Sequence, residues 1–135
     1  MAKFFITNNP QWYKVLKENI SKTDFKLSFD YSSEDVYALA VHKLNIKNQN
    51  AVQESKDFCI ATGTCIYKES LDVMPMLQDY NDNLATIRNS ALGQYAISVF
   101  KNGNVSVFTD VLGAYDVYYY SANNRGGVYN KLFAI

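Results

Sequence analysis

The sequence predicts an α+β domain in which helices cover antiparallel sheets. The composition favours strands, with 11 Tyr and 8 Phe among 135 residues and 48% apolar residues overall. About seven segments have the apolar pattern of strands, and two have the three- and four-residue spacing of helices. The two helical segments lie far apart along the chain, so we expect antiparallel sheets rather than an alternation of strands and helices.

The first third of the chain is predicted to contain a strand, a helix and two more strands. Residues 3–7 form the opening strand. Asn9 and Pro10 mark the start of a helix, because asparagine caps free amides and proline fits the first helical position. The helix ends at about residue 19. Its core-facing side chains are Trp12, Val15, Leu16 and Ile20.

Residues 25–31 alternate aromatic or leucine side chains with polar ones, which is the period of a half-buried strand. After a turn, residues 36–46 form the next predicted strand. The segment 46–56, IKNQNAVQESK, is polar and irregular and is predicted to be a surface loop. Residues 58–67 form another strand.

Pro75 opens the second predicted helix. Its apolar stripe indicates a face that packs on the core. The stripe consists of Leu77, Tyr80, Leu84 and Ile87.

The last third of the chain is predicted to form two hairpins. Residues 93–108 fold back at Asn102 and Gly103, a pair that suits a two-residue type I′ turn. Asp110 and Gly113 then bound a break that redirects the chain. The second hairpin joins residues 118–121 to 128–135 across the segment ANNRGG.

The charge balance argues against a nucleic-acid partner. Thirteen basic and thirteen acidic residues cancel, and neither sign forms a long run. A protein that binds nucleic acid through its phosphates normally has a basic excess. No apolar run is long enough to span a membrane and no signal peptide is visible, so no membrane partner is expected.

Cys59 and Cys65 are predicted to be free thiols. Both fall on one strand, and at about 3.3 Å per residue they would lie roughly 20 Å apart, which is too far for a disulfide. Free thiols indicate a reducing compartment, so we expect a cytoplasmic protein.

Four short motifs follow one another in an order typical of one family. LAVHKLNI at 39–46 is followed by GTCIYKES at 63–70, and Asp72 precedes the second helix. The fourth motif runs from 93 to 119 and consists of Gly93, Tyr95, Ala96, Asp110, Leu112, Gly113, Tyr118 and Tyr119. This pattern resembles the N-terminal glutaminase-type domain of asparagine synthetase-like proteins, the class II glutamine amidotransferases. Thr109 and Asp116 depart from it, because the family has arginine and proline there.

The resemblance implies a four-layer α-β-β-α sandwich of the N-terminal nucleophile hydrolase type, with two antiparallel sheets between helices. Residues 1–135 would form a single glutamine amidotransferase-like domain. It would be the N-terminal part of a longer protein that forms amide bonds with ATP. The implied partner is a C-terminal synthetase-type domain, and ATP and Mg²⁺ are expected only there, with no cofactor in this chain. A homodimer is compatible with this arrangement.

The resemblance also implies that the catalytic nucleophile is missing. A family glutaminase uses a cysteine that becomes the first residue after methionine removal, and its free α-amino group serves as the base. This chain has Ala2 at that position. Cys59 and Cys65 lie in mid-chain and cannot supply an N-terminal amine.

Four residues fall at the family's substrate-binding positions. Lys43 replaces the arginine that grips the substrate carboxylate, and Gly63 and Thr64 replace the pair that supplies oxyanion donors. Asp72 falls where active members hold the substrate's α-amino group. Each also has a structural interpretation: Lys43 as a surface lysine, Gly63 as a strand kink and Asp72 as an acid at a helix N-terminus. His42 is interpreted as an ordinary strand residue.

The sequence therefore predicts a degenerate glutaminase-like domain with a structural or substrate-positioning role, not itself catalytic. Two alternatives stay open. One is an active amidotransferase or hydrolase with a differently processed N-terminus. The other is a stand-alone module that binds a peptide or a small amine.

Overall fold

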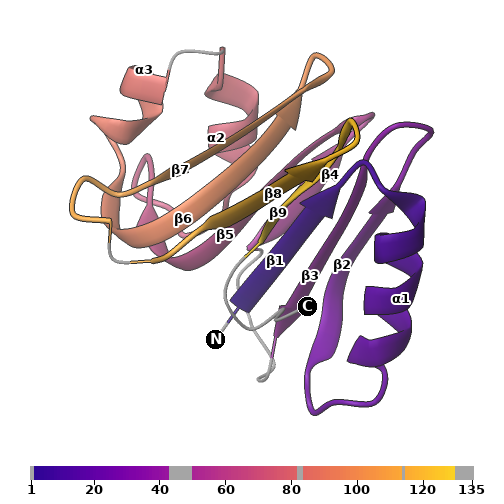
Figure 1. Cartoon of the computed structure of the whole chain (residues 1–135). Coiled ribbons are helices and arrows are strands. Elements are labelled where there is room, and N and C mark those ends of the chain that lie inside the picture. Colours follow the sequence, from indigo (N-terminus) through magenta and orange to yellow (C-terminus); the bar gives the residue numbers. More distant parts are fainter. Residues whose placement is uncertain (1, 43–49, 82–83, 114, 130–135) are drawn as a thin grey trace. The chain divides into compact units, whose positions relative to one another are not determined.

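The computed structural model describes residues 2–42, 50–81, 84–113 and 115–129 (Figure 1). The described part of the chain contains nine strands and three helices, and its two sheets are both antiparallel. The predicted α+β class with antiparallel sheets is thus confirmed. The chain divides into two compact units: unit 1 comprises Met1–Asn45 and Asp116–Ile135, and unit 2 comprises Ile46–Tyr115.

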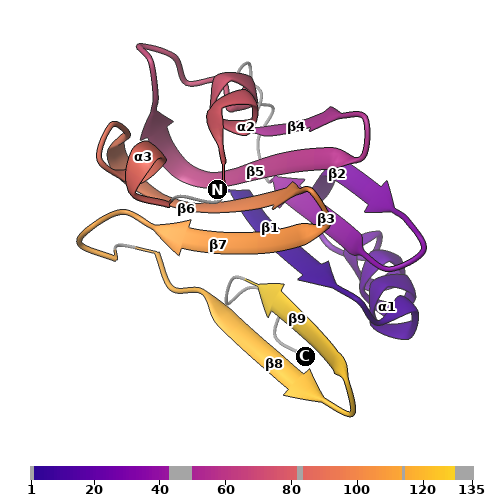
Figure 2. The ribbon, with the colours of Figure 1, turned by 90° about the horizontal axis from the view of Figure 1, so that it is seen from above.

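Unit 1 is built from both ends of the chain. Its sheet has the strand order β2-β3-β1-β9-β8, so the first strand, β1, pairs with β9 from the other end of the sequence (Figure 2). Its elements are β1 (Ala2–Thr7), α1 (Pro10–Ile20), β2 (Lys26–Ser32), β3 (Tyr37–His42), β8 (Tyr118–Ala122) and β9 (Arg125–Tyr129).

Helix α1 begins where the sequence predicts and covers one face of this sheet. The Asn9 side chain accepts a hydrogen bond from the Gln11 amide at 3.0 Å, which satisfies a free amide of the first turn. The core under the helix contains Phe5, Ile20, Leu39 and Val41, with Trp12, Tyr13, Leu16, Phe25 and Tyr129 packed against it. The prediction that Val15 faces the core is wrong, because Val15 is 53% exposed. Tyr13 packs there instead, with its ring centroid 5.0 Å from that of Tyr37.

Unit 2 is a continuous segment with its own sheet, in the order β4-β5-β6-β7. Helices α2 and α3 both lie on one face of that sheet (Figure 1). Its elements are β4 (Ala51–Glu54), β5 (Asp57–Ile66), α2 (Met74–Asp79), α3 (Leu84–Arg88), β6 (Leu92–Lys101) and β7 (Asn104–Thr109). The core between helices and sheet includes Val52, Cys59, Met76, Leu77, Ile87, Ile97 and Val99.

The predicted surface loop at 46–56 is wrong for Ala51–Glu54, which form edge strand β4. This strand pairs with β5, and the Ala61 amide donates to the Asn50 carbonyl at 2.7 Å. An edge strand with one buried face needs few apolar residues. Here Val52, opposite Cys59, supplies the buried contact while Gln53 and Glu54 stay exposed.

The second predicted helix is also corrected, because it is two short helices rather than one. Tyr80 ends α2 with an extended backbone, φ −65° and ψ 128°. The break includes Tyr80 and Asn81, and an asparagine side chain competes with helical hydrogen bonds. The apolar stripe is nevertheless buried where its side chains are described, at Leu77, Tyr80 and Ile87.

The hairpin of β6 and β7 forms as predicted, and β8 pairs with β9 in a second hairpin. Of the predicted last strand at 128–135, residues 130–135 lie outside the described residues. Asn102 and Gly103 have φ of 54° and 81°, which confirms the type I′ turn between β6 and β7. Asn123 and Asn124, with φ of 53° and 62°, turn the chain from β8 to β9. This turn is shorter than the predicted ANNRGG connection, because Arg125, Gly126 and Gly127 already belong to β9.

Candidate functional site

Ala2 is the first residue of β1, and its backbone partner across the sheet is His42 in β3. Position 2 therefore lies beside the residue that precedes Lys43 in the sequence. Lys43 itself lies outside the described residues. Ala2 belongs to unit 1, whereas Gly63, Thr64 and Asp72 belong to unit 2.

Gly63 and Thr64 are exposed residues near the end of β5. Gly63 has a φ of +89°, which L side chains rarely adopt, so the predicted strand kink is present. A second such residue, Gly93 with φ +121°, lies nearby in β6, where it pairs with Cys65. Between the two glycines Thr64 faces Gln94 across the ladder. The two glycines let β5 and β6 approach each other more closely than side chains would permit.

Asp72 makes local contacts at the start of α2. Its carboxylate accepts a hydrogen bond from the Met74 amide at 3.0 Å, and its own amide donates to the Ser70 hydroxyl at 3.0 Å. Met74 is the first residue of the helix, so the carboxylate satisfies an amide that the helix leaves unpaired. These contacts account for an aspartate at this position without a ligand.

Tyr67 anchors α2 to the end of β5. Its hydroxyl donates to the Asp79 carboxylate at 2.7 Å, and the Lys68 ammonium pairs with the same carboxylate at 2.6 Å. Burial, reinforced by the Asp79 contact, raises the pKa of Tyr67 to about 12. The tyrosine therefore stays protonated at neutral pH and serves as a structural hydrogen-bond donor.

Neither cysteine has the environment of a nucleophile. Cys59 and Cys65 are both free thiols, as predicted, and both are buried in unit 2. Burial raises the pKa of Cys65 to about 11 and also raises that of Cys59. The reactive form of a cysteine is the thiolate, so both thiols are inert near neutral pH.

The burial of Cys65 makes the free energy of unfolding depend on pH in the alkaline range. An unfolded thiol at position 65 loses its proton near its ordinary pKa of 9.0, whereas the folded one keeps it up to about 11. We therefore expect the free energy of unfolding to fall as pH rises through this window, by up to about 1.4 kcal/mol per pH unit for this proton. Urea unfolding at several pH values measures the slope. The Cys65→Ala variant should show a shallower slope, and an identical slope would contradict the assignment.

Asp110, which the sequence places at the break after β7, is buried and joins several segments through hydrogen bonds. Its carboxylate accepts from the Tyr95 amide at 3.1 Å, and its own amide donates to the Tyr95 carbonyl at 3.1 Å. The Asp110 carbonyl accepts from the Gly113 amide at 3.0 Å and from the Arg88 guanidinium at 3.3 Å. These bonds tie the turn at 110–113 to β6 and α3.

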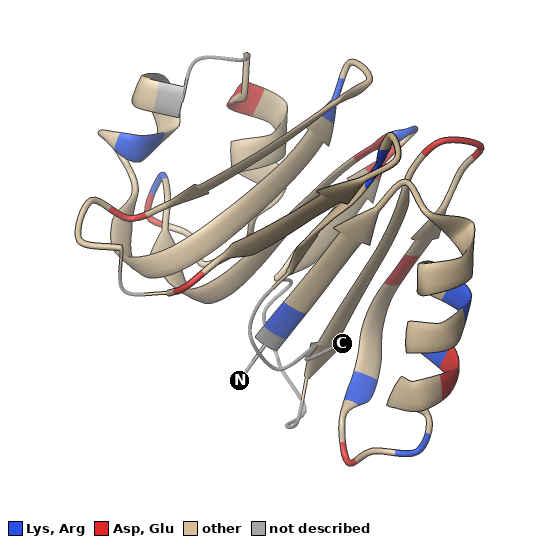
Figure 3. Ribbon diagram, in the orientation of Figure 1, with Lys and Arg blue, Asp and Glu red and all other residues tan. Residues whose placement is uncertain are grey.

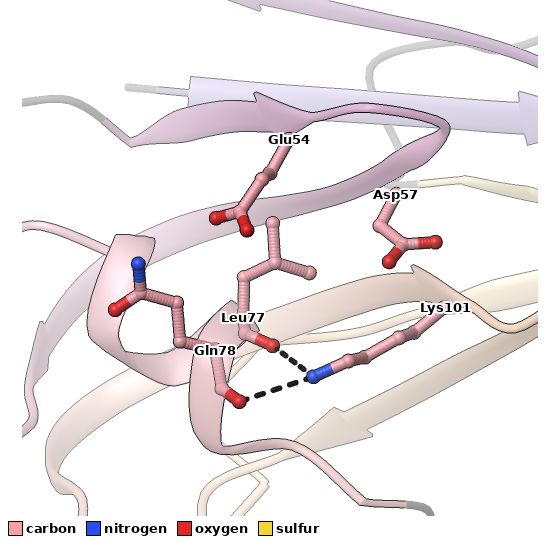
Figure 4. Close-up of a pocket in the computed structure, with 5 residues that line it drawn as sticks. All are labelled: Glu54, Asp57, Leu77, Gln78 and Lys101. Atoms are coloured by element: carbon pink, nitrogen blue, oxygen red, sulfur yellow. Dashed lines mark hydrogen bonds between the residues drawn. The ribbon is translucent and has the colours of Figure 1, made fainter.

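A pocket of about 200 Å³ lies in unit 2, apart from the predicted site residues. Lys101 reaches across it and donates to the Leu77 and Gln78 carbonyls at 2.7 and 3.1 Å (Figure 4). Glu54 and Asp57, which face each other across the β4–β5 hairpin, supply two carboxylates to its lining. The lysine satisfies carbonyls in the last turn of α2, where a positive charge is favourable. Sequence analysis missed this contact, because nothing local to Lys101 indicates carbonyl partners 23 and 24 residues away.

We expect Lys101→Met to lower the free energy of unfolding by about 1–2 kcal/mol, because it removes two charge-assisted hydrogen bonds at a partly exposed position. Urea denaturation measures the change. Lys101→Arg should retain most of the stability. The matched control is Lys14→Met on the exposed face of α1, which should change stability by less than about 0.5 kcal/mol. Equal effects at positions 101 and 14 would show that the hydrogen bonds from Lys101 to the last turn of α2 do not stabilise the fold.

Charges of both signs are spread over the described elements (Figure 3). Among the described residues no group of three or more His, Cys, Asp or Glu side chains could hold a metal ion. No helix in the described part of the chain is both long and apolar enough to cross a membrane.

Comparison with known proteins identifies no relative: no family model, no curated protein and no solved structure matches this chain.

Proposed function

We propose that this chain is a glutaminase-like domain that lacks the N-terminal nucleophile and serves a structural or substrate-positioning role. Its partner would be a synthetase-type domain of an asparagine synthetase-like protein that forms amide bonds with ATP. The observation that carries the proposal is Ala2 at the start of β1, together with the four sequence motifs of this family. The two buried thiols support it, because neither can replace the missing cysteine.

The contacts around the remaining candidate residues agree with a structural role. Asp72 is engaged with the Met74 amide, and Gly63 serves the close approach of β5 and β6. Free thiols agree with a cytoplasmic setting, which is part of the proposal.

The proposed fold is the four-layer α-β-β-α sandwich of the N-terminal nucleophile hydrolases. In unit 1 the sheet face away from α1 is apolar, with Phe4, Ile6, Ala38 and Ala40. In unit 2 the face away from the helices carries Phe58, Ile60, Ala96 and Phe100. Apolar sheet faces must be buried against another layer, as a layered sandwich requires.

The activity part of the proposal is tested by two measurements on the purified chain. Mass spectrometry of the native N-terminus should find Ala2 as the first residue or Met1 retained. An ammonia assay with L-glutamine should show no release above a buffer control. Ammonia release by the wild-type chain would overturn the proposal and favour an active amidotransferase or hydrolase.

The proposed synthetase-type partner domain is tested by the coding sequence that follows codon 135. A synthetase-type domain with an ATP-pyrophosphate loop, encoded after codon 135, would support it, and a stop codon there would contradict it. Thermal-shift screening of amino acids and small amines tests the third candidate, a stand-alone binding module. A stabilising response that disappears in a Lys43→Ala, Asp72→Ala variant would favour that module.

A further inference from the structure

Strand β8 forms one edge of the sheet of unit 1, and no described strand pairs with its outer side. Its five residues, YYYSA, carry no charge, and Tyr119 is 82% exposed. Natural sheets normally protect an edge with charged residues, proline or a β-bulge, because unpaired backbone groups there attract another strand. The opposite edge, β2, is protected by Lys26, by Asp30 and by a register shift between Leu27 and Phe29. Strand β8 has none of these features.

The backbone of Ser121 points outward from this edge. Its partner in β9 is Gly126, whose amide donates to the Asn8 side chain at 2.8 Å and whose carbonyl accepts from the Asn8 amide at 3.2 Å. Both groups of Gly126 therefore point away from β8. Opposite residues of an antiparallel ladder alternately exchange both bonds or none, so Ser121 directs its amide and carbonyl away from β9. Tyr119, two residues along the strand, does the same.

The spacing of these outward groups lets the strand pair with a second copy of itself. If two β8 strands run antiparallel with Tyr120 opposite Tyr120, then Tyr119 of each copy stands opposite Ser121 of the other. Both of these Tyr119–Ser121 pairs can exchange backbone hydrogen bonds, because the amide and carbonyl of each residue point outward. No like charges face each other across the two-fold axis. The end near Asp116 of each strand meets the end near Arg125 of the other, so opposite charges lie together.

We propose that this chain self-associates by antiparallel pairing of β8 with β8 of a second copy. The two five-stranded sheets join into one continuous sheet, and the interface is isologous. The Tyr120 ring at the centre is positioned by Trp12, with 4.2 Å between the ring centroids, and aromatic pairs across strands stabilise antiparallel pairing. The uncharged centre and the oppositely charged ends favour a second copy over a strongly charged partner strand. The pairing holds whether or not the chain is a glutaminase-like domain.

Self-association is tested by analytical ultracentrifugation of the purified chain over a series of concentrations. The wild type should show an equilibrium between monomer and dimer. Tyr119→Pro removes an outward amide without removing a bond to β9, so it should weaken dimerisation by at least about tenfold. Ser121→Lys places a charge on the same edge and serves the same purpose if the proline variant does not fold.

The matched control is Ser28→Lys on β2, an exposed residue of the opposite edge strand, which should leave the dimer unchanged. A wild type that stays monomeric at every concentration would overturn the inference. So would a dimer that neither Tyr119→Pro nor Ser121→Lys weakens, because the contact would then lie on another surface.

The register is tested by disulfide trapping. Tyr120→Cys places two cysteines opposite each other in a pair without backbone bonds, where the α-carbons are about 4.5 Å apart and a disulfide can form. Mild oxidation should then give a covalent dimer. Tyr118→Cys is the matched control, because Tyr118 and Tyr120 are 37% and 40% exposed. The two copies of position 118 would lie about 13 Å apart, too far for a disulfide. Equal crosslinking at both positions, or none at either, would contradict the proposed pairing.

Discussion

Replacing Gly93 with alanine is expected to lower the free energy of unfolding by about 3–5 kcal/mol, because strain and steric overlap add at this position. Gly93 has a φ of +121°, and its β-carbon would lie 2.1 Å from the Thr64 carbonyl oxygen. That oxygen belongs to the backbone of β5, so relief requires the β5–β6 ladder to open. A domain with an ordinary stability of about 5–15 kcal/mol would lose a large part of it.

The matched control is Gly103→Ala. Gly103 also has a positive φ, +81°, but its β-carbon would meet no heavy atom within 4 Å. Only backbone strain applies there, so we expect a loss of about 1 kcal/mol. Urea denaturation of both variants separates the cost of backbone strain from the cost of steric overlap. Similar losses at positions 93 and 103 would show that β5 and β6 do not approach as closely as described.

Replacing Asp110 with alanine is expected to lower the free energy of unfolding by about 2–3 kcal/mol. Asp110 is 5% exposed, and its carboxylate is the acceptor for the buried Tyr95 amide. Removing the carboxylate leaves that amide buried without this partner, which costs its full desolvation. The turn at 110–113 should loosen as well, and hydrogen exchange at the Tyr95 amide should become faster.

Asp110→Asn is the control for charge, because its side-chain oxygen can still accept from Tyr95. We expect a loss of about 1 kcal/mol or less for asparagine. If asparagine and alanine are equally destabilising, the negative charge rather than the hydrogen bond is what the fold requires. If neither substitution changes the free energy of unfolding, the hydrogen bonds of Asp110 do not stabilise the fold.

The elements predicted correctly from the sequence are those whose cause is local. The Asn9 cap and Pro10 set the start of α1, and Asn102 with Gly103 sets the β6–β7 turn. In each case the decisive contacts lie within a few residues, so residue type alone specifies the conformation. The two free thiols also followed from sequence spacing on one strand.

The elements predicted wrongly depend on partners that are distant in the sequence. β4 is polar, and it is a strand because β5 offers it an edge. Helix α2 ends at Tyr80 although the apolar stripe continues, and Lys101 from the end of β6 binds carbonyls of its last turn. Val15 had the right spacing for the core, but Tyr13 fills the place beside Tyr37.

The candidate site divides in the same way. Alanine at position 2 and the order of the four motifs that resemble the family follow from the sequence alone, since these are statements about residue identity. The burial of both thiols and the position of the Tyr115 ring beside Gly63 depend instead on contacts between distant parts of the chain. The last contact joins residues about fifty positions apart, and no local propensity or spacing encodes it. Desolvation and steric exclusion depend on which atoms surround a group, and the fold alone supplies those atoms.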